Sequence, residues 1–126
     1  MSGRVVHFEV PYDDAERARG LYADVFGWHV RSIPELGYDL VSTGPVDEEG
    51  MPTEPGYVGG GMSQRGEPLS RPVITIAVDD IDATLEKVRG GGGAQVGEKI
   101  TAAEMGIAAY FDDSDGNLMG LWQNTP

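Results

Sequence analysis

The chain alternates between short runs of β-favouring residues and two longer runs with helical spacing. Residues Val5–Val10 are mostly apolar and predict a strand that Pro11 ends. Asp13 and Asp14 then offer N-cap carboxylates, and Glu16 follows Asp13 at the spacing of a capping box. Apolar side chains recur after this point at intervals of three and four residues. This spacing predicts an amphipathic helix that packs one face on a sheet.

The segment after this helix predicts three further strands, over residues 28–33, 38–42 and 57–63. The longest loop, residues 43–56, is rich in glycine, proline and acidic residues. A loop of this length is either a functional lid or a disordered surface excursion. Three consecutive glycines, residues 59–61, interrupt the fourth strand. We expect either a sharp bend there or a group packed close to the backbone.

The second half of the chain repeats this order of elements. Asp79 or Asp80 caps a predicted helix with an apolar stripe, and four strands accompany it, over residues 73–78, 94–100, 107–111 and 118–122. The simplest account is a duplicated βαβββ unit, with one module over about 4–63 and the other over about 72–123. The sequence therefore predicts one α+β domain over residues 1–126, in which two βαβββ modules form a curved eight-stranded mixed sheet.

Length, charge and cysteine content indicate which partners and which cellular location to expect. The chain has 126 residues, no cysteine and a formal net charge of −12. Such an acidic surface disfavours nucleic acid and anionic membranes as partners. No secretory signal or bilayer-spanning run is visible, and the absence of cysteine fits a reducing cytosol, so we expect a cytoplasmic location.

Several motifs together resemble those of the vicinal oxygen chelate superfamily, the group of glyoxalases, bleomycin-resistance proteins and extradiol dioxygenases. The resemblance covers nearly the whole chain and implies a ligand held in the concavity of a cup-shaped sheet, and frequent homodimers. Metalloenzymes of the family hold a divalent ion through side chains from the first and last strand of each module. The motifs are His7–Val10 with Asp13–Asp14, Glu16–Ala18, Leu21–Tyr22, Val25–Trp28, Val78–Ile81 and Asp113–Asn117.

The resemblance places the four metal-ligand positions at His7, near Gly60, at Val73 and at Gly120. Only the histidine has a side chain that coordinates a metal, although Glu9 could add a second donor. Divalent ions need about three or four protein donors. We therefore expect no complete metal site and no metal cofactor.

Strand alternation places His7 and Glu9 on the groove side of the first strand. The pair can act as a general base with its carboxylate, or can simply line a polar cavity. Small side chains at the vacated ligand positions leave room for an apolar or aromatic ligand, with two aromatic residues as stacking surfaces. The predicted ligand-binding residues are His7, Glu9, Tyr57, Gly60, Val73, Thr75, Gly120 and Trp122.

Two functions remain open from the sequence. The first is a glyoxalase-like protein that binds or sequesters a small organic ligand without a complete metal site. The alternative is a small lyase, isomerase or dioxygenase that uses His7 and Glu9, with or without a divalent metal. The sequence names neither the ligand nor the partner with which each module pairs.

Overall fold

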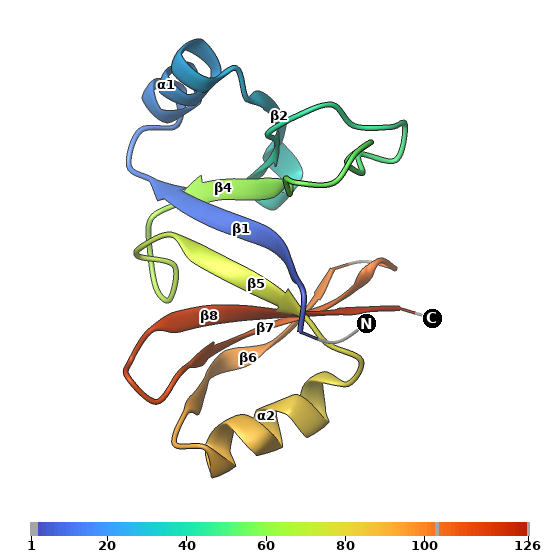
Figure 1. Cartoon of the computed structure of the whole chain (residues 1–126). Coiled ribbons are helices and arrows are strands. Elements are labelled where there is room, and N and C mark those ends of the chain that lie inside the picture. The colour runs from blue at the N-terminus through green and yellow to red at the C-terminus, as the bar shows by residue number, and fades with distance from the viewer. Residues whose placement is uncertain (1–2, 103, 126) are drawn as a thin grey trace. The chain divides into compact units, whose positions relative to one another are not determined.

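A computed structural model describes residues 3–102 and 104–125 of the chain (Figure 1). These residues form two compact units. The N-terminal unit is His7–Pro72, and the C-terminal unit contains the residues from Val73 onward together with the described residues up to Val6. Each unit contains one α-helix and strands of the sheet.

The N-terminal unit is the first βαβββ module. Its strands have the order β2-β3-β4-β1, in which β1 and β4 are parallel and the other neighbours are antiparallel. Helix α1 connects β1 to β2, and the 3-10 helix η1 connects β2 to β3 (Figure 1). The elements are β1 (Val5–Tyr12), α1 (Ala15–Phe26), β2 (His29–Ile33), η1 (Pro34–Leu36), β3 (Tyr38–Ser42) and β4 (Gly60–Gln64).

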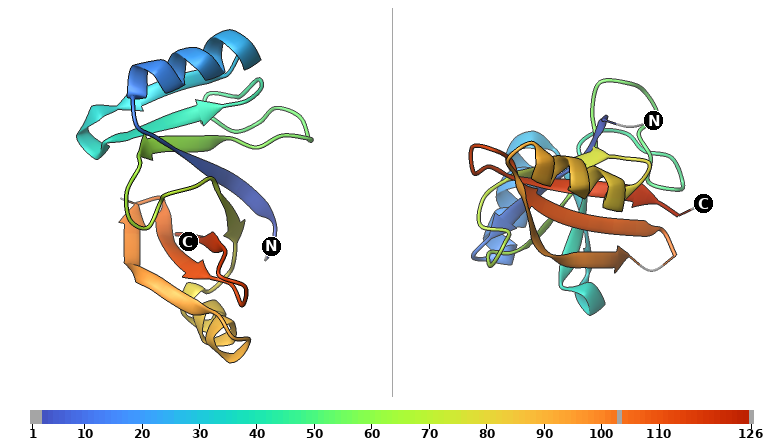
Figure 2. Two further views of the ribbon diagram at one scale, coloured as in Figure 1. Left: turned by 90° about the vertical axis from the view of Figure 1, so that its left-hand side faces the viewer. Right: turned by 90° about the horizontal axis from the view of Figure 1, so that it is seen from below.

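The C-terminal unit repeats this arrangement, with strand order β5-β8-β7-β6 and a parallel pair β5–β8 (Figure 2). The start of the chain pairs with this unit, because Gly3 N–H donates to the Ala77 carbonyl at 2.7 Å and Ala77 N–H donates to the Arg4 carbonyl at 2.8 Å. The strand order over the mixed sheet is β2-β3-β4-β1-β5-β8-β7-β6. The elements are β5 (Val73–Ala77), α2 (Ile81–Gly90), β6 (Ala94–Ala102), β7 (Gly106–Asp112) and β8 (Leu118–Asn124).

The predicted fold class, α+β with two βαβββ modules and eight strands, is confirmed. Most strand boundaries differ from the prediction by one to three residues, and those of β1 and β4 have a clear cause. Strand β1 continues through Pro11, which lies opposite Ser63, and the Tyr12 carbonyl accepts a hydrogen bond from Arg65 N–H at 2.8 Å. A proline removes only its own donor, so the pairing with β4 continues past it. Strand β4 starts at Gly60 rather than at Tyr57, because the preceding residues belong to the loop.

The first helix begins one residue later than a capping box requires. Asp14 is the N-cap, and its side chain accepts from Arg17 N–H at 3.1 Å, whereas Asp13 forms an ion pair with Arg65. Gly27 ends the helix in the left-handed conformation, as glycine allows. Neither α1 nor α2, the two α-helices of the described residues, is long and apolar enough to cross a membrane.

Each unit packs its helix on one face of its own strands. In the N-terminal unit the ring of Tyr22 on α1 stacks on Trp28 at 4.7 Å, and Trp28 contacts the ring of Phe8 on β1 at 5.4 Å. The C-terminal unit has a hydrophobic core between α2, β7 and β8. Its buried members are Ile81, Leu85, Ala109, Phe111 and Leu121.

Candidate functional site

The two faces of β1 have different chemistry, as strand alternation predicts. Phe8 faces the helix and joins the aromatic cluster of Tyr22 and Trp28. Successive side chains of a strand point to opposite faces, so His7 and Glu9 lie on the face away from α1. This face is therefore the polar one in the N-terminal unit.

The side chain of Tyr38, on β3, hydrogen-bonds to both His7 and Glu9. The hydroxyl of Tyr38, the first residue of β3, lies 2.9 Å from His7 Nε2 and donates to Glu9 Oε2, also at 2.9 Å. All three side chains are partly buried. The structure thus brings His7 and Glu9 together through a third residue, to form a hydrogen-bonded triad.

The triad depends on a glycine in β4. Gly61 lies opposite Glu9, and a Cβ atom built on it would overlap the phenol end of Tyr38. The absence of a side chain at this position leaves the space that the Tyr38 ring fills. A close approach to the backbone is therefore the reason for the glycines, and it is one of the two explanations that the sequence left open.

Gly60 needs a correction. The sequence placed it on the ligand-facing side with His7, but it lies opposite Phe8 in the parallel pairing of β1 and β4. A Cβ atom on Gly60 would meet the Phe8 ring at 2.6 Å. Because residues paired across a sheet share a face, Gly60 belongs to the helix side, and Gly61 is the glycine beside the triad.

Burial controls the charge of the triad. Burial lowers the pKa of His7, and the nearby Glu9 carboxylate opposes this shift without cancelling it. The imidazole is therefore neutral at pH 7. Tyr38 has one proton and donates it to Glu9, so the bond between Tyr38 and His7 requires Nε2–H as the donor. In this arrangement His7 Nδ1 has the free lone pair.

An ion pair on the opposite side of β3 holds the strand that carries the tyrosine. Asp39 is 1% exposed and accepts from Arg19 Nε at 2.8 Å and from Nη2 at 3.2 Å. This hydrogen bond to the carboxylate raises the pKa of Arg19 further above its ordinary value. The two-point contact between α1 and β3 fixes the strand at the residue next to Tyr38.

The predicted residues of the C-terminal unit fall on one face of β5 and β8. Ile76 packs on the core beneath α2, so Thr75 lies on the other face. Thr75 is opposite Gly120, whose missing side chain leaves room for the Thr75 hydroxyl, and Val73 is buried. Thr75 is also buried, and it carries the one polar side chain among Val73, Thr75 and Gly120.

Trp122 and Tyr57 each lie over a glycine of their own unit. A Cβ atom on Gly106 would meet the Trp122 ring at 2.6 Å, and the indole N–H donates to Asn124 Oδ1 at 2.6 Å. Tyr57 covers Gly44, and its hydroxyl donates to the Pro45 carbonyl at 2.6 Å. Tyr57 thus packs against other residues of its own loop. The roles of both aromatic residues in ligand binding stay predictions.

Sequence reasoning missed Tyr38, although the pattern contains a signal for it. Tyr38 is opposite Ser63 in the antiparallel pair of β3 and β4, so Gly61 is its diagonal neighbour. Aromatic side chains reach diagonal neighbours across a sheet and often cover a strand glycine. The sequence signal was a strand that begins with tyrosine and precedes a glycine-rich strand, because this combination predicts a tyrosine ring packed over a glycine.

Comparison with known proteins agrees with this fold. A family model for the N-terminal part of bleomycin resistance protein-like proteins matches residues 4–44. The chain is 33% identical over 126 residues to a glyoxylase-like domain-containing protein of Didymella fabae, with 96% of this chain and 94% of that protein covered. The chain belongs to the vicinal oxygen chelate (VOC) superfamily. It is also 32% identical over 118 residues to CFP32 of Mycobacterium bovis, of which it spans 41%.

Solved structures share the VOC fold at low sequence identity. A glyoxalase/bleomycin resistance protein/dioxygenase superfamily member from Vibrio splendidus aligns with a TM-score of 0.61 and 19% identity, over 97% of this chain and 98% of that one. Methylmalonyl-CoA epimerase from Mycobacterium tuberculosis aligns with a TM-score of 0.61 and 18% identity, over 98% and 89%. These likenesses concern the fold.

At the positions where VOC metalloenzymes have metal ligands, this chain has mostly residues that cannot bind a metal. His7 carries a donor, but Gly61, Val73 and Gly120 have no side chain that binds a metal. Among the described residues, no group of three or more His, Cys, Asp or Glu side chains is close enough to hold a metal ion. The residues present therefore do not fit the metal that the family implies.

Proposed function

We propose that this VOC protein binds a small organic molecule on the sheet face of His7, Tyr38 and Glu9, and that it does so without a divalent metal. The observation that supports the proposal is the position of Tyr38. Its hydroxyl lies between the two candidate donors, above the backbone of Gly61. The ring of Tyr38 thus fills the space that a side chain at position 61 of β4 would occupy.

A metal at this place would require the loss of two hydrogen bonds. An ion bound between His7 Nε2 and Glu9 Oε2 would have to displace the Tyr38 hydroxyl from both, and these two side chains together provide two donors. Two donors are too few to offset this loss and the dehydration of a divalent ion. An organic ligand needs no such displacement, since the triad offers it a neutral imidazole, a phenol and a carboxylate as hydrogen-bonding partners.

The first test is elemental analysis and thermal unfolding of protein purified without a metal-affinity tag. We expect no stoichiometric metal, and the same Tm with EDTA as with added Zn²⁺, Ni²⁺ or Mn²⁺. A content near one metal per chain would overturn the proposal. In the same assay, aromatic metabolites, dicarbonyl adducts, cationic glycopeptides and methylmalonyl-CoA serve as ligands. A ligand at 100 times its dissociation constant stabilises the protein by about 2.7 kcal/mol.

Variants then locate the binding site. Tyr38→Phe keeps the ring above Gly61 and removes the hydroxyl, so we expect roughly tenfold weaker binding of any ligand found, or about 1.4 kcal/mol. Tyr57→Phe is the matched control, because it removes a hydroxyl that bonds within the loop. Equal binding by wild type and Tyr38→Phe would place the ligand elsewhere.

A second candidate function, an enzyme with His7 as general base, follows from the neutral state of the imidazole. Its Nδ1 lone pair can accept a proton at pH 7, with Glu9 acting on it through Tyr38. We expect His7→Ala to abolish turnover with an unchanged circular dichroism spectrum. Turnover that persists in this variant would exclude the mechanism, while leaving ligand binding open.

The assembly and location of the protein stay predictions. The family resemblance implies a homodimer, and the composition and charge favour a cytoplasmic location with no nucleic-acid or membrane partner. Light scattering after size-exclusion chromatography measures the mass. A single peak at the monomer mass of 13.5 kDa would contradict the dimer.

A further inference from the structure

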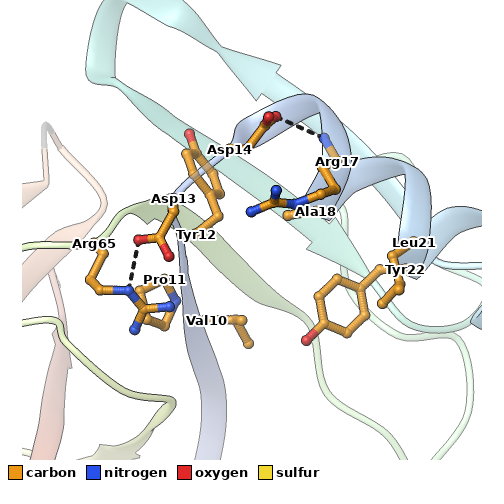
Figure 3. A pocket seen from close by; sticks show the side chains of 10 residues that line it. All are labelled: Val10, Pro11, Tyr12, Asp13, Asp14, Arg17, Ala18, Leu21, Tyr22 and Arg65. Carbon is orange, nitrogen blue, oxygen red and sulfur yellow. Dashed lines mark hydrogen bonds and ion pairs between the residues drawn. The ribbon is translucent and has the colours of Figure 1, made fainter.

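A cavity lies on the other face of β1 from the triad, between this strand and α1. It has a volume of about 280 Å³ and is formed entirely by the N-terminal unit. Val10 lines it and shares a strand face with Phe8, so the cavity is on the opposite side of β1 from His7. Figure 3 shows the lining side chains, which are Val10, Pro11, Tyr12, Asp13, Asp14, Arg17, Ala18, Leu21, Tyr22 and Arg65.

The acidic side chains of this cavity already have partners. Asp13 Oδ1 accepts from Arg65 Nε at 2.8 Å, and Asp14 Oδ1 accepts from the backbone N–H of Arg17 at 3.1 Å. Arg65 also donates to the Ser70 carbonyl at 2.6 Å. Two carboxylates and two guanidinium groups surround the space, so the local charge is balanced in a chain whose net charge is −12. The immediate surroundings therefore do not repel an anion.

Two hydrogen-bond donors of the cavity are unused. Among the described residues, neither the guanidinium of Arg17 nor the hydroxyl of Tyr22 has a hydrogen-bond partner. In Figure 3 these groups and Arg65 are arranged around the side chain of Val10. A planar guanidinium matches the two oxygens of a carboxylate, and the phenol can donate to one of them. The guanidinium of Arg17 can only donate, and the hydroxyl of Tyr22 can donate as well as accept.

The rest of the lining is apolar. Val10, Ala18 and Leu21 contribute hydrocarbon surface, and Leu21 leaves 52% of its own surface exposed. Covering such surface with an apolar group stabilises a complex by roughly 25 cal/mol for each Å² removed from water. The volume is near the lower end of ordinary ligand pockets, which are about 300 to 1,000 Å³, so a one-ring molecule is a suitable size.

We propose that this cavity is a second ligand site, and that it binds a small organic acid with an apolar body. The carboxylate lies at Arg17 and Tyr22, and the aromatic or branched aliphatic body covers Val10 and Leu21. The site is independent of the His7 triad, because the two occupy opposite faces of β1. A protein with both sites binds one molecule on each face of the same strand.

The test is titration of isotopically labelled protein with benzoate, followed by amide chemical shifts. Benzyl alcohol and benzylamine are the uncharged and cationic comparisons. We expect benzoate to shift the amides of residues 10–22 and of Arg65, and not those of Tyr38 or Gly61. We expect at least tenfold weaker binding of both comparison compounds. Equal binding of benzyl alcohol, or shifts confined to the triad, would overturn the proposal.

Matched variants identify the anion contact. Arg17→Gln should weaken benzoate binding roughly tenfold, equivalent to about 1.4 kcal/mol. Arg31→Gln removes the same charge from an exposed position of β2 in the same unit and should leave the affinity unchanged. His7→Ala should also leave it unchanged, whether or not the triad binds its own ligand. Unaltered affinity in Arg17→Gln, or equal losses in both arginine variants, would refute the assignment.

Discussion

A single methyl group at Gly61 tests the geometry of the triad. In Gly61→Ala the new Cβ atom would coincide with the space of the Tyr38 phenol. The atoms it meets belong to the far end of a side chain, so the ring can rotate away while the backbone stays in place. Rotation breaks the hydrogen bonds to His7 and Glu9, both 2.9 Å long. We therefore expect a folded protein without its triad.

The magnitude follows from the two lost hydrogen bonds. A bond to a carboxylate contributes roughly 1.5–3 kcal/mol and a neutral one roughly 0.5–1.5 kcal/mol. The lower ends apply because water reaches these partly buried groups. Replacement of glycine also restricts the unfolded chain, which returns roughly 0.4–1 kcal/mol. The lower ends sum to about 2 kcal/mol, so the expected net loss is about 1–1.6 kcal/mol of unfolding free energy.

The assay is urea unfolding, followed by circular dichroism and by tryptophan fluorescence. Coincident transitions are required before a single free energy is assigned, since the chain has two compact units. Gly20→Ala is the control, because a Cβ atom on this glycine of α1 meets nothing within 4 Å. It should stabilise the helix by roughly 0.5–1 kcal/mol.

A double-mutant cycle gives the decisive result. In a Tyr38→Ala background the space above Gly61 is open, so Gly61→Ala should cost nothing there and should return the roughly 0.4–1 kcal/mol of the unfolded-chain effect. The unfolded-chain effect is the same in both backgrounds, so the difference between them, about 2 kcal/mol, measures the coupling between the glycine and the phenol. Equal costs in both backgrounds would show that the methyl group meets something other than Tyr38, and the proposed basis of the triad would fail.

Two further predictions concern the charged and titratable groups of the same unit. Arg19→Met leaves the Asp39 carboxylate, 1% exposed, without its cation, and should cost roughly 2–4 kcal/mol in urea unfolding. The same change at exposed Arg31 should stay within about 0.5 kcal/mol, and similar losses would contradict the role of the pair. Burial lowers the pKa of His7, so the unfolded chain takes up this proton first as the pH falls below the ordinary value of 6.5. Stability contributed by neutral His7 is present above pH 6.5 and declines below it, and His7→Gln should show a flatter profile between pH 7.5 and 5.5. Parallel profiles for the two proteins would rule out this contribution.

Much of the fold was predictable because its signals are local. The strand 38–42 and the αL cap at Gly27 follow from side chains within a few residues of each other. Hydrophobic periodicity reports such short-range order well. The strand boundaries were less accurate, since β1 extends past Pro11 through a hydrogen bond with Arg65 from a later segment. Local propensity contains no information about that partner.

The candidate site was predictable only in part. Alternation along β1 placed His7 and Glu9 together without any knowledge of the other strands. The error at Gly60 came from the unknown pairing of β1 with β4, because a change of one residue in register moves a side chain to the opposite face. The assignment of Tyr57 to the ligand site stays untested, and the structure shows this residue packed within its own loop.

The amino-acid sequence by itself determined the order of helices and strands, the duplication and the family, because these depend on periodicity and on local motifs. The tertiary structure alone decided which groups meet. Tyr38 and His7 are 31 residues apart in the chain, and Arg19 and Asp39 are 20 apart. Their contacts depend on strand register and on the packing of a helix over a sheet, which only the folded chain specifies.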